Sequence, residues 1–293
     1  MTEDEILSLF DTCCNWNRWP DHAERGTLNY ISYDVTLRAL RLVQYGVVVS
    51  LGRILSSRDS DPTEFVHHML PTDDHSVADE TSVSPHGFTI THMDAIGHSL
   101  FRDRIYGGRQ VEPNTIAQGL LYGSIEAMRD GIVTRGVLLD VAGARGVSCL
   151  ENGETITIDD LIAAERLAGV TVSPGDAVFV RAGRTFQAPD TSPNAAGNRT
   201  GVDPSTLAWF HERQVAVYSG DCIERVPSGY SSIPMPLHQV GHVAMGLAIL
   251  DNPDVPQLYR VAKAYHRHTF LLVVAPLRIV GGTGSAVNPL AVF

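Results

Sequence analysis

The chain has 293 residues, of which 44% are hydrophobic and 19% charged, which is enough for a sizeable core in one large domain or two small ones. Its formal net charge of −11 argues against nucleic acid and anionic membrane surfaces as partners, because both attract basic proteins. Residues 1–11 are polar and acidic, and no run approaches the roughly 20 apolar residues of a membrane helix. The 4 cysteines form no Cys-x-x-Cys pair, which predicts reduced thiols and a cytoplasmic protein.

Helix and strand signals mix along the chain. In the first half, apolar residues at helical spacing predict a helix over residues 34–45, and the short apolar run 47–51 predicts a buried strand. Residues 56–84 are polar and irregular, which indicates a loop or flap. Residues 88–94 then predict a strand, and residues 116–129 predict a helix.

The second half alternates more regularly. One helix is expected to begin at Thr157 or Asp159, either of which can cap it, and to end at Gly169. The other predicted elements are strands at 137–141, 177–181, 214–219 and 269–274 and helices at 205–212, 237–250 and 256–264. Helices and apolar strands interspersed in this way predict an α/β or α+β domain.

Residues 91–98, with the sequence THMDAIGH, place two imidazoles and a carboxylate within eight positions. If residues 91–94 are extended, side chains alternate between faces, so His92 and Asp94 point the same way. A turn after Asp94 could then bring His98 to the same point. This donor set suits a borderline divalent metal such as Zn²⁺ or Mn²⁺. Spacing alone leaves a second interpretation open, in which the histidines of a polar turn hydrogen-bond locally.

The same segment resembles the H-x-G-T-H-x-D-x-P-x-H motif of the cyclase family, which includes bacterial kynurenine formamidase and isatin hydrolase. Shorter similarities follow in order along the chain, at residues 19–20, 26–29, 49–52, 135–140, 175–178, 275–278, 281–285 and 288–289. The resemblance implies an α/β fold of layered β/β/α type, described as swivelling-domain-like, with a curved, barrel-like sheet core. We expect one such domain over residues 1–293, with an N-terminal extension of about 45 residues packed on it.

The resemblance also implies roles for particular residues. His92 and Asp94 match the central metal ligands of the motif, and His98 matches its last histidine, a ligand or a proton shuttle. His238 matches a histidine from a second segment, so that His98 and His238 are the expected catalytic residues. Asp251 stands where the family has a glutamate and is shorter by one methylene, about 1.5 Å, so its role as a ligand stays open.

The sequence departs from the family pattern at Phe88, where the formamidases have a histidine. We therefore predict one divalent metal ion, zinc or manganese, rather than two. His86, in the His-Gly pair of the longer members, could line the pocket or lie in a solvated loop. His242, four residues after His238, could face the same cavity or the solvent. Phe88 itself could supply an aromatic wall for a flat substrate, although core packing is the usual role of such a residue.

The expected activity is metal-dependent hydrolysis, and the resemblance implies an amide, cyclic amide or lactone in a small, aromatic or cyclic substrate. The metal would lower the pKa of its bound water towards about 7, and His98 would carry the proton to the leaving group. Two alternatives stay open: a polyketide-type cyclase or lyase, and a catalytically degenerate member of the family. The resemblance further implies a homodimer or homotetramer with a small molecule as substrate. The net charge of −11 predicts neither nucleic acid nor membrane as partner.

Overall fold

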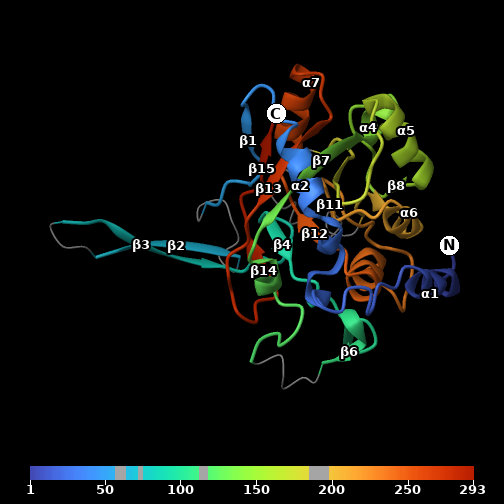
Figure 1. The fold of residues 1–293 in the computed structure, drawn as a ribbon, viewed down its shortest axis with the longest axis horizontal. Coiled ribbons are helices and arrows are strands. Elements are labelled where there is room, and N and C mark those ends of the chain that lie inside the picture. Colours follow the sequence, from blue (N-terminus) through green and yellow to red (C-terminus); the bar gives the residue numbers. More distant parts are fainter. Residues whose placement is uncertain (57–63, 72–74, 112–117, 185–197) are drawn as a thin grey trace.

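The computed structural model of the protein describes residues 1–56, 64–71, 75–111, 118–184 and 198–293. Its centre is a curled sheet (Figure 1). The strand order in this sheet is β1-β15-β13-β7-β9-β11-β12-β4-β14. The strands in this order are Val48–Ser50, Leu290–Val292, Thr269–Val274, Ile132–Asp140, Ala177–Arg181, Val217–Gly220, Ala248–Asp251, His92–Asp94 and Gly284–Ala286.

The four central strands, β7, β9, β11 and β12, are parallel, and antiparallel strands extend the sheet on both sides. Their residues are apolar on both faces: Val137 and Leu139 belong to one core cluster, and Leu138 belongs to the other. Burial on both faces is typical of parallel strands that are connected by crossover helices. The crossovers bring the carboxyl ends of these strands to one edge, where α/β proteins place their ligands.

Helices cover both faces of the sheet (Figure 1). Thr157 caps α5 in a capping box with Asp160, and Gly169 ends it in a left-handed conformation, as the sequence predicted. The helices and helical turns are α1 Glu3–Thr12, η1 Ala23–Tyr30, α2 Tyr33–Leu40, η2 Tyr106–Gly108, η3 Ile125–Met128, α4 Val141–Ala144, α5 Ile158–Ala168, α6 Thr206–Glu212, η4 Leu237–Met245 and α7 Val255–Ala264. Within the described ranges, no helix is both long and apolar enough to span a lipid bilayer.

The N-terminal segment packs on the helix η4. The Asn15 amide donates to the carbonyl of Met245 at 2.9 Å, and the Trp16 indole donates to the carbonyl of Val243 at 2.7 Å. The Thr27 hydroxyl donates to the carbonyl of Ala216 at the start of β11 at 2.7 Å. These buried bonds connect the N-terminal segment to η4 and to a central strand, and so hold that helix against the sheet.

Several predicted elements are confirmed: β9 and β13 have the predicted bounds, and α5, α6 and α7 lie within two residues of theirs. Others were wrong in extent. The helix predicted at 34–45 ends at Leu40, and the strand at 88–94 covers only His92–Asp94. The helix predicted at 116–129 is a single turn, Ile125–Met128, and its first two residues lie outside the described part of the chain.

Two predictions failed for a clear physical reason. Residues 237–250 are two elements: Gly246 adopts a left-handed conformation that ends η4, and β12 follows. A fully buried strand is apolar throughout, so its sequence cannot be distinguished from that of a buried helix. Residues 56–84 include a hairpin, β2 Phe65–Leu70 with β3 Ala78–Val83, which extends from the body (Figure 1). Its strands are exposed on both faces and lack the alternating pattern that marks a half-buried strand.

Two short strand pairs complete the described elements: β5 Arg104–Ile105 with β6 Arg109–Gln110, and β8 Thr155–Ile156 with β10 Gly201–Val202.

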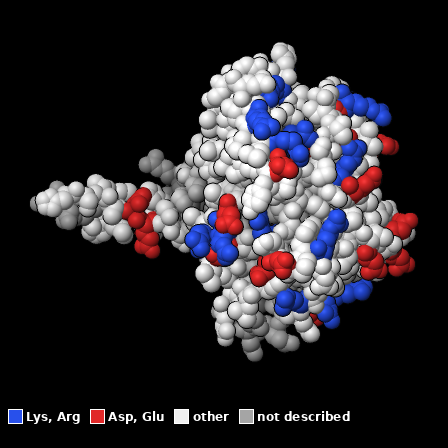
Figure 2. Space-filling model, viewed as in Figure 1, with Lys and Arg blue, Asp and Glu red and all other residues white. Residues whose placement is uncertain are grey.

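Basic and acidic side chains are interspersed over the face of the molecule shown in Figure 2.

Candidate metal centre

The strand β4 carries His92 and Asp94 on one side, as the alternation of an extended chain requires. Met93 between them points the other way and is completely buried in the core. The register of the sheet determines which residues of the adjacent strands lie beside them. Asp251 of β12 pairs directly with His92, and Gly284 of β14 pairs with Asp94.

A second segment contributes His238, the second residue of the π-helix η4. Its Nε2 atom lies 3.7 Å from Asp94 Oδ2 and 3.7 Å from Asp251 Oδ2. On the other side, His92 Nε2 lies 3.4 Å from Asp94 Oδ1 and 3.7 Å from Asp251 Oδ2. Ligand atoms about 2.0–2.2 Å from one zinc ion at tetrahedral angles are roughly 3.3–3.6 Å apart. The spacings in this set of four side chains are therefore close to those of a metal site.

The two histidines of this set are oriented by hydrogen bonds from their other ring nitrogens. His92 Nδ1 lies 2.8 Å from the carbonyl oxygen of Ile90, which can only accept, so the ring donates there. His238 Nδ1 lies 2.6 Å from Glu224 Oε1 and donates to that carboxylate. Both bonds leave the Nε2 atoms facing the site, and such partners are typical of histidines that bind metals.

Glu224 does more than orient one ring. Its two carboxylate oxygens also accept the backbone N–H groups of Leu237 and His238, each at 3.2 Å, at the start of η4. The carboxylate therefore satisfies two free N–H groups of the helix and one imidazole at once. Nothing in the sequence singles out this residue, because a lone glutamate 14 positions before a histidine matches no local motif.

The charges of the side chains around this point favour a positive charge there. Burial disfavours the charged form of His92, but Asp94 and Asp251 outweigh it and raise its pKa to about 9. Burial by itself would raise the pKa of Asp94. Contacts with His86 and His92 outweigh this effect and hold the pKa well below the usual range. The two carboxylates thus favour a positive charge between the rings, as a cation site requires.

His86 and His98 lie on the other side of Asp94. His86 Nδ1 is 3.0 Å from Asp94 Oδ1, and His86 Nε2 is 2.9 Å from the Thr283 hydroxyl. The rings of His86 and His98 stack, with centroids 3.8 Å apart and planes at 4°. Burial, together with the neighbouring histidines, outweighs the charge of Asp94 and lowers the pKa of His98 to about 4, so the ring is neutral at neutral pH. The sequence left open whether His86 lines the pocket or lies in a solvated loop. The structure places it beside Asp94, in the site.

The ligating atoms form two overlapping groups, His86–Asp94–His98 and His92–Asp94–Asp251, which share Asp94. Both carboxylate oxygens of Asp94 are buried and accept no well-directed hydrogen bond from the described residues. Buried carboxylate oxygens normally have partners, and an ion would supply one. The donors present, imidazole nitrogens and carboxylate oxygens, therefore fit a borderline divalent metal.

The remaining predicted residues differ in their positions. His242 is completely buried beside His238, with ring centroids 5.4 Å apart. Phe88 lies outside the ligand groups: it is 54% exposed, and the Arg199 guanidinium lies over its ring. Asp251 reaches both histidines in spite of its shorter side chain, because the register places it directly opposite His92.

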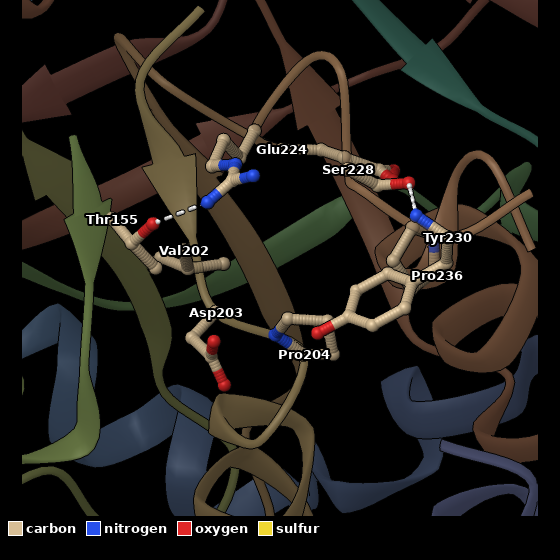
Figure 3. A pocket seen from close by; sticks show the side chains of 9 residues that line it. Thr155, Val202, Asp203, Pro204, Glu224, Ser228, Tyr230 and Pro236 are labelled. Carbon is tan, nitrogen blue, oxygen red and sulfur yellow. Dashed lines mark hydrogen bonds between the residues drawn. The ribbon is translucent and has the colours of Figure 1, made fainter. Parts of the chain in front are cut away.

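A small cavity of about 20 Å³ adjoins the centre at Glu224 (Figure 3). It has room for roughly one water molecule. The Arg225 guanidinium donates to the Thr155 hydroxyl at 3.2 Å on one wall, and Tyr230 lies on another. Its lining includes Glu224 but none of the predicted ligands, so this cavity lies beside the metal centre and is not the substrate site.

Comparison with known proteins decides the family. The family model described as "Putative cyclase" matches residues 20–224, a range that holds the β4 motif and Glu224. The chain belongs to the cyclase family. A crystal structure of a novel cyclase is 27% identical to it, with a TM-score of 0.84, and the match covers 96% of this chain and 100% of that one. The cyclase-family fold and the predicted resemblance are thereby confirmed.

Two further structures share the fold at lower identity. Isatin hydrolase A from Labrenzia aggregata, bound to benzyl benzoate, is 21% identical, with a TM-score of 0.60 over 84% of this chain and 93% of that one. Isatin hydrolase A from Ralstonia solanacearum is 20% identical, with a TM-score of 0.57 over 89% of this chain and 97% of that one. The comparison with curated proteins gives no match.

Proposed function

We propose that this cyclase-family protein is a metal-dependent hydrolase. Its substrate would be a small, aromatic or cyclic amide, cyclic amide or lactone, cleaved by water that the metal activates. The observation that carries the proposal is the convergence of His92, Asp94, His238 and Asp251 from two strands and a helix on one buried point. The fold that the chain shares with isatin hydrolases supports the same reaction class.

One divalent ion, zinc or manganese, is the proposed cofactor, held by His92, Asp94, His238 and Asp251. When bound, such an ion lowers the pKa of water to about 7 and polarises a carbonyl group. The hydrogen bonds from Nδ1 of His92 and His238 prepare both Nε2 atoms for the ion. Among the described residues, no comparable acceptor orients His98, which supports one ion rather than two.

His98 is the proposed proton carrier. It stacks on His86, which Thr283 anchors, so the His98 ring is positioned from the side, through its face. A base in this position can take a proton from the attacking water and return it to the leaving amine or alkoxide. His238, which the sequence also assigned to catalysis, is proposed to act by holding the metal.

The test combines metal analysis of the purified protein with a panel of aryl formamides, cyclic imides and lactones. We expect about one zinc or manganese ion per chain and turnover of at least one class. His92→Ala should remove both metal and turnover, because it removes a ligand and leaves two buried carboxylates unpaired. His67→Ala, in the exposed hairpin, should change neither. Full activity in a metal-free His92→Ala protein would sink the proposal.

The mass of the product separates hydrolysis from the cyclase or lyase alternative. Hydrolysis adds one water to the substrate, whereas ring closure does not. A protein that binds neither zinc nor manganese would favour the degenerate alternative. Two ions per chain would place the second in the His86–Asp94–His98 group.

A further inference from the structure

One ring nitrogen of His242 makes no hydrogen bond within the described part of the structure. The ring is completely buried, and its Nε2 atom has no hydrogen-bond partner among the described residues. Leaving a buried polar atom unpaired is unfavourable, because the atom loses its hydrogen bonds to water and gains none in return. Such an atom beside a catalytic centre therefore indicates a partner that arrives with the reaction.

The helix η4 explains why this ring faces the centre. A π-helix has a wider turn than an α-helix and is frequent at functional sites. It places His242 one turn after His238, with ring centroids 5.4 Å apart, and 6.3 Å from the ring of His98. His242 thus lies near both the metal ligand and the proposed proton carrier, without being part of either ligand group.

Ser99 fixes the ring from its other nitrogen. The Ser99 hydroxyl lies 2.9 Å from His242 Nδ1, at the opposite end of the ring from the unpaired Nε2. Ser99 directly follows His98, so the motif segment that presents the proton carrier also orients His242. If the hydroxyl donates to Nδ1, the single proton of a neutral imidazole is on Nε2.

We infer that the Nε2–H group of His242 donates a hydrogen bond to the acyl oxygen of the substrate, with Ser99 holding the ring in position. This inference rests on the proposed hydrolase function, since negative charge develops on that oxygen during acyl cleavage. A donor aimed at it from a water-excluded site strengthens as the charge develops. His242 is then a catalytic residue, and Ser99 is a positioning residue.

The kinetic test compares four forms of the metal-loaded protein: wild type, His242→Ala, Ser99→Ala and Val240→Ala. Losing one such donor lowers kcat by about 10²- to 10³-fold, and we expect this for His242→Ala with little change in KM. Added imidazole should restore part of the lost rate by filling the vacated space. Ser99→Ala should lower kcat by about tenfold, because the ring stays but loses its anchor. Val240→Ala removes a buried neighbour on the same helix and should keep kcat close to the wild-type value.

Metal content separates the possible roles. His242→Ala should keep the wild-type metal content; loss of the ion would make His242 a ligand and overturn the inference. Wild-type kcat in His242→Ala, or an equal loss in Val240→Ala without imidazole rescue, would also overturn it. A wild-type protein that holds metal and hydrolyses a substrate, while His242→Ala does so equally well, contradicts this inference alone. A wild-type protein with neither metal nor turnover contradicts the proposed function and this inference with it.

A measurement without turnover tests the tautomer. Long-range ¹H–¹⁵N NMR spectra of the zinc-loaded protein distinguish a proton on Nε2 from one on Nδ1, and His242→Ala identifies the signals. We expect the Nε2–H form in the wild type and a mixture of both forms in Ser99→Ala. A wild-type ring with its proton on Nδ1 cannot donate from Nε2 and would refute the assignment.

Discussion

Glu224 is the residue on which the geometry of the metal centre most depends without being a ligand. Its carboxylate accepts His238 Nδ1 at 2.6 Å and two backbone N–H groups at the start of η4. Glu224→Gln keeps the size of the side chain but replaces one acceptor oxygen by a donor and removes the charge. We expect metal affinity to fall by about 10- to 100-fold, as for other partners of metal-binding histidines. A competition titration with a chromophoric chelator measures this directly.

The exposed Glu212, on α6, supplies the matched control for that titration. Glu212→Gln changes the net charge by the same amount at a site without contact to the centre in the structure, so its metal affinity should equal that of the wild type. If both variants lost affinity equally, net charge rather than the Glu224–His238 bond would explain the effect.

At the level of single residues, the sequence predicts what is local and misses what the fold brings together. His92 and Asp94 follow from strand alternation alone, because neighbours two apart share a face. Glu224 and Ser99 had no comparable signal: each meets its histidine across a separation of 14 and 143 positions, respectively. The absence of a histidine at Phe88 was visible, but not that His86 reaches Asp94 instead.

Among the elements, the strand β14 determines how closely His86 can approach. Gly284 pairs with Asp94, and a Cβ atom at this position would lie 2.7 Å from His86 Cε1. Gly284→Ala should therefore push the His86 ring away from Asp94 and disturb its stacking on His98. We expect turnover to fall by roughly tenfold while the metal held by the His92 group stays bound. Metal content and kcat, measured on the same preparation, check both parts.

Gly241, inside η4, gives the corresponding control. A Cβ atom there would meet its nearest neighbours at 3.4–3.7 Å, which is ordinary contact. Alanine is also the better helix former, so Gly241→Ala should keep activity and stability. Loss of the metal in Gly284→Ala would show instead that β14 supports the whole centre and not only His86.

Elements were predicted best where a turn or cap marks their ends. The helix α5 has both a capping threonine and a terminal glycine, and its bounds were predicted correctly. The run 237–250 continues without a capping residue to mark a break, and the boundary between η4 and β12 depends on Gly246, whose left-handed conformation the pattern does not reveal. That boundary matters for function, because it separates His238 from Asp251 and lets both reach the same point.

At the scale of the whole molecule, the curled sheet gathers the centre. Ligands come from β4 and β12, which are neighbours in the sheet, although 154 positions separate Asp94 from Ala248. Such a juxtaposition cannot be read from local patterns, and only the resemblance to the cyclase family pointed to it. We retain as proposals the single domain over residues 1–293 and the homodimer or homotetramer.

The hairpin of β2 and β3 is the segment that we propose as a contact between copies of the chain. Of its two strands only Phe65 is buried, and acidic side chains lie along it (Figure 2). An isolated two-stranded hairpin is at best marginally stable in water, so we expect a second copy of the chain to cover it. Replacing residues 66–83 by a short Gly-Ser turn should then reduce the oligomer, measured by light scattering. The urea midpoint of the shortened chain should equal that of the wild type. As a comparison, Leu250→Ala, in the core, should lower the free energy of unfolding by about 2–5 kcal/mol. A shortened chain with the wild-type mass in solution would show that the hairpin does not hold the copies together.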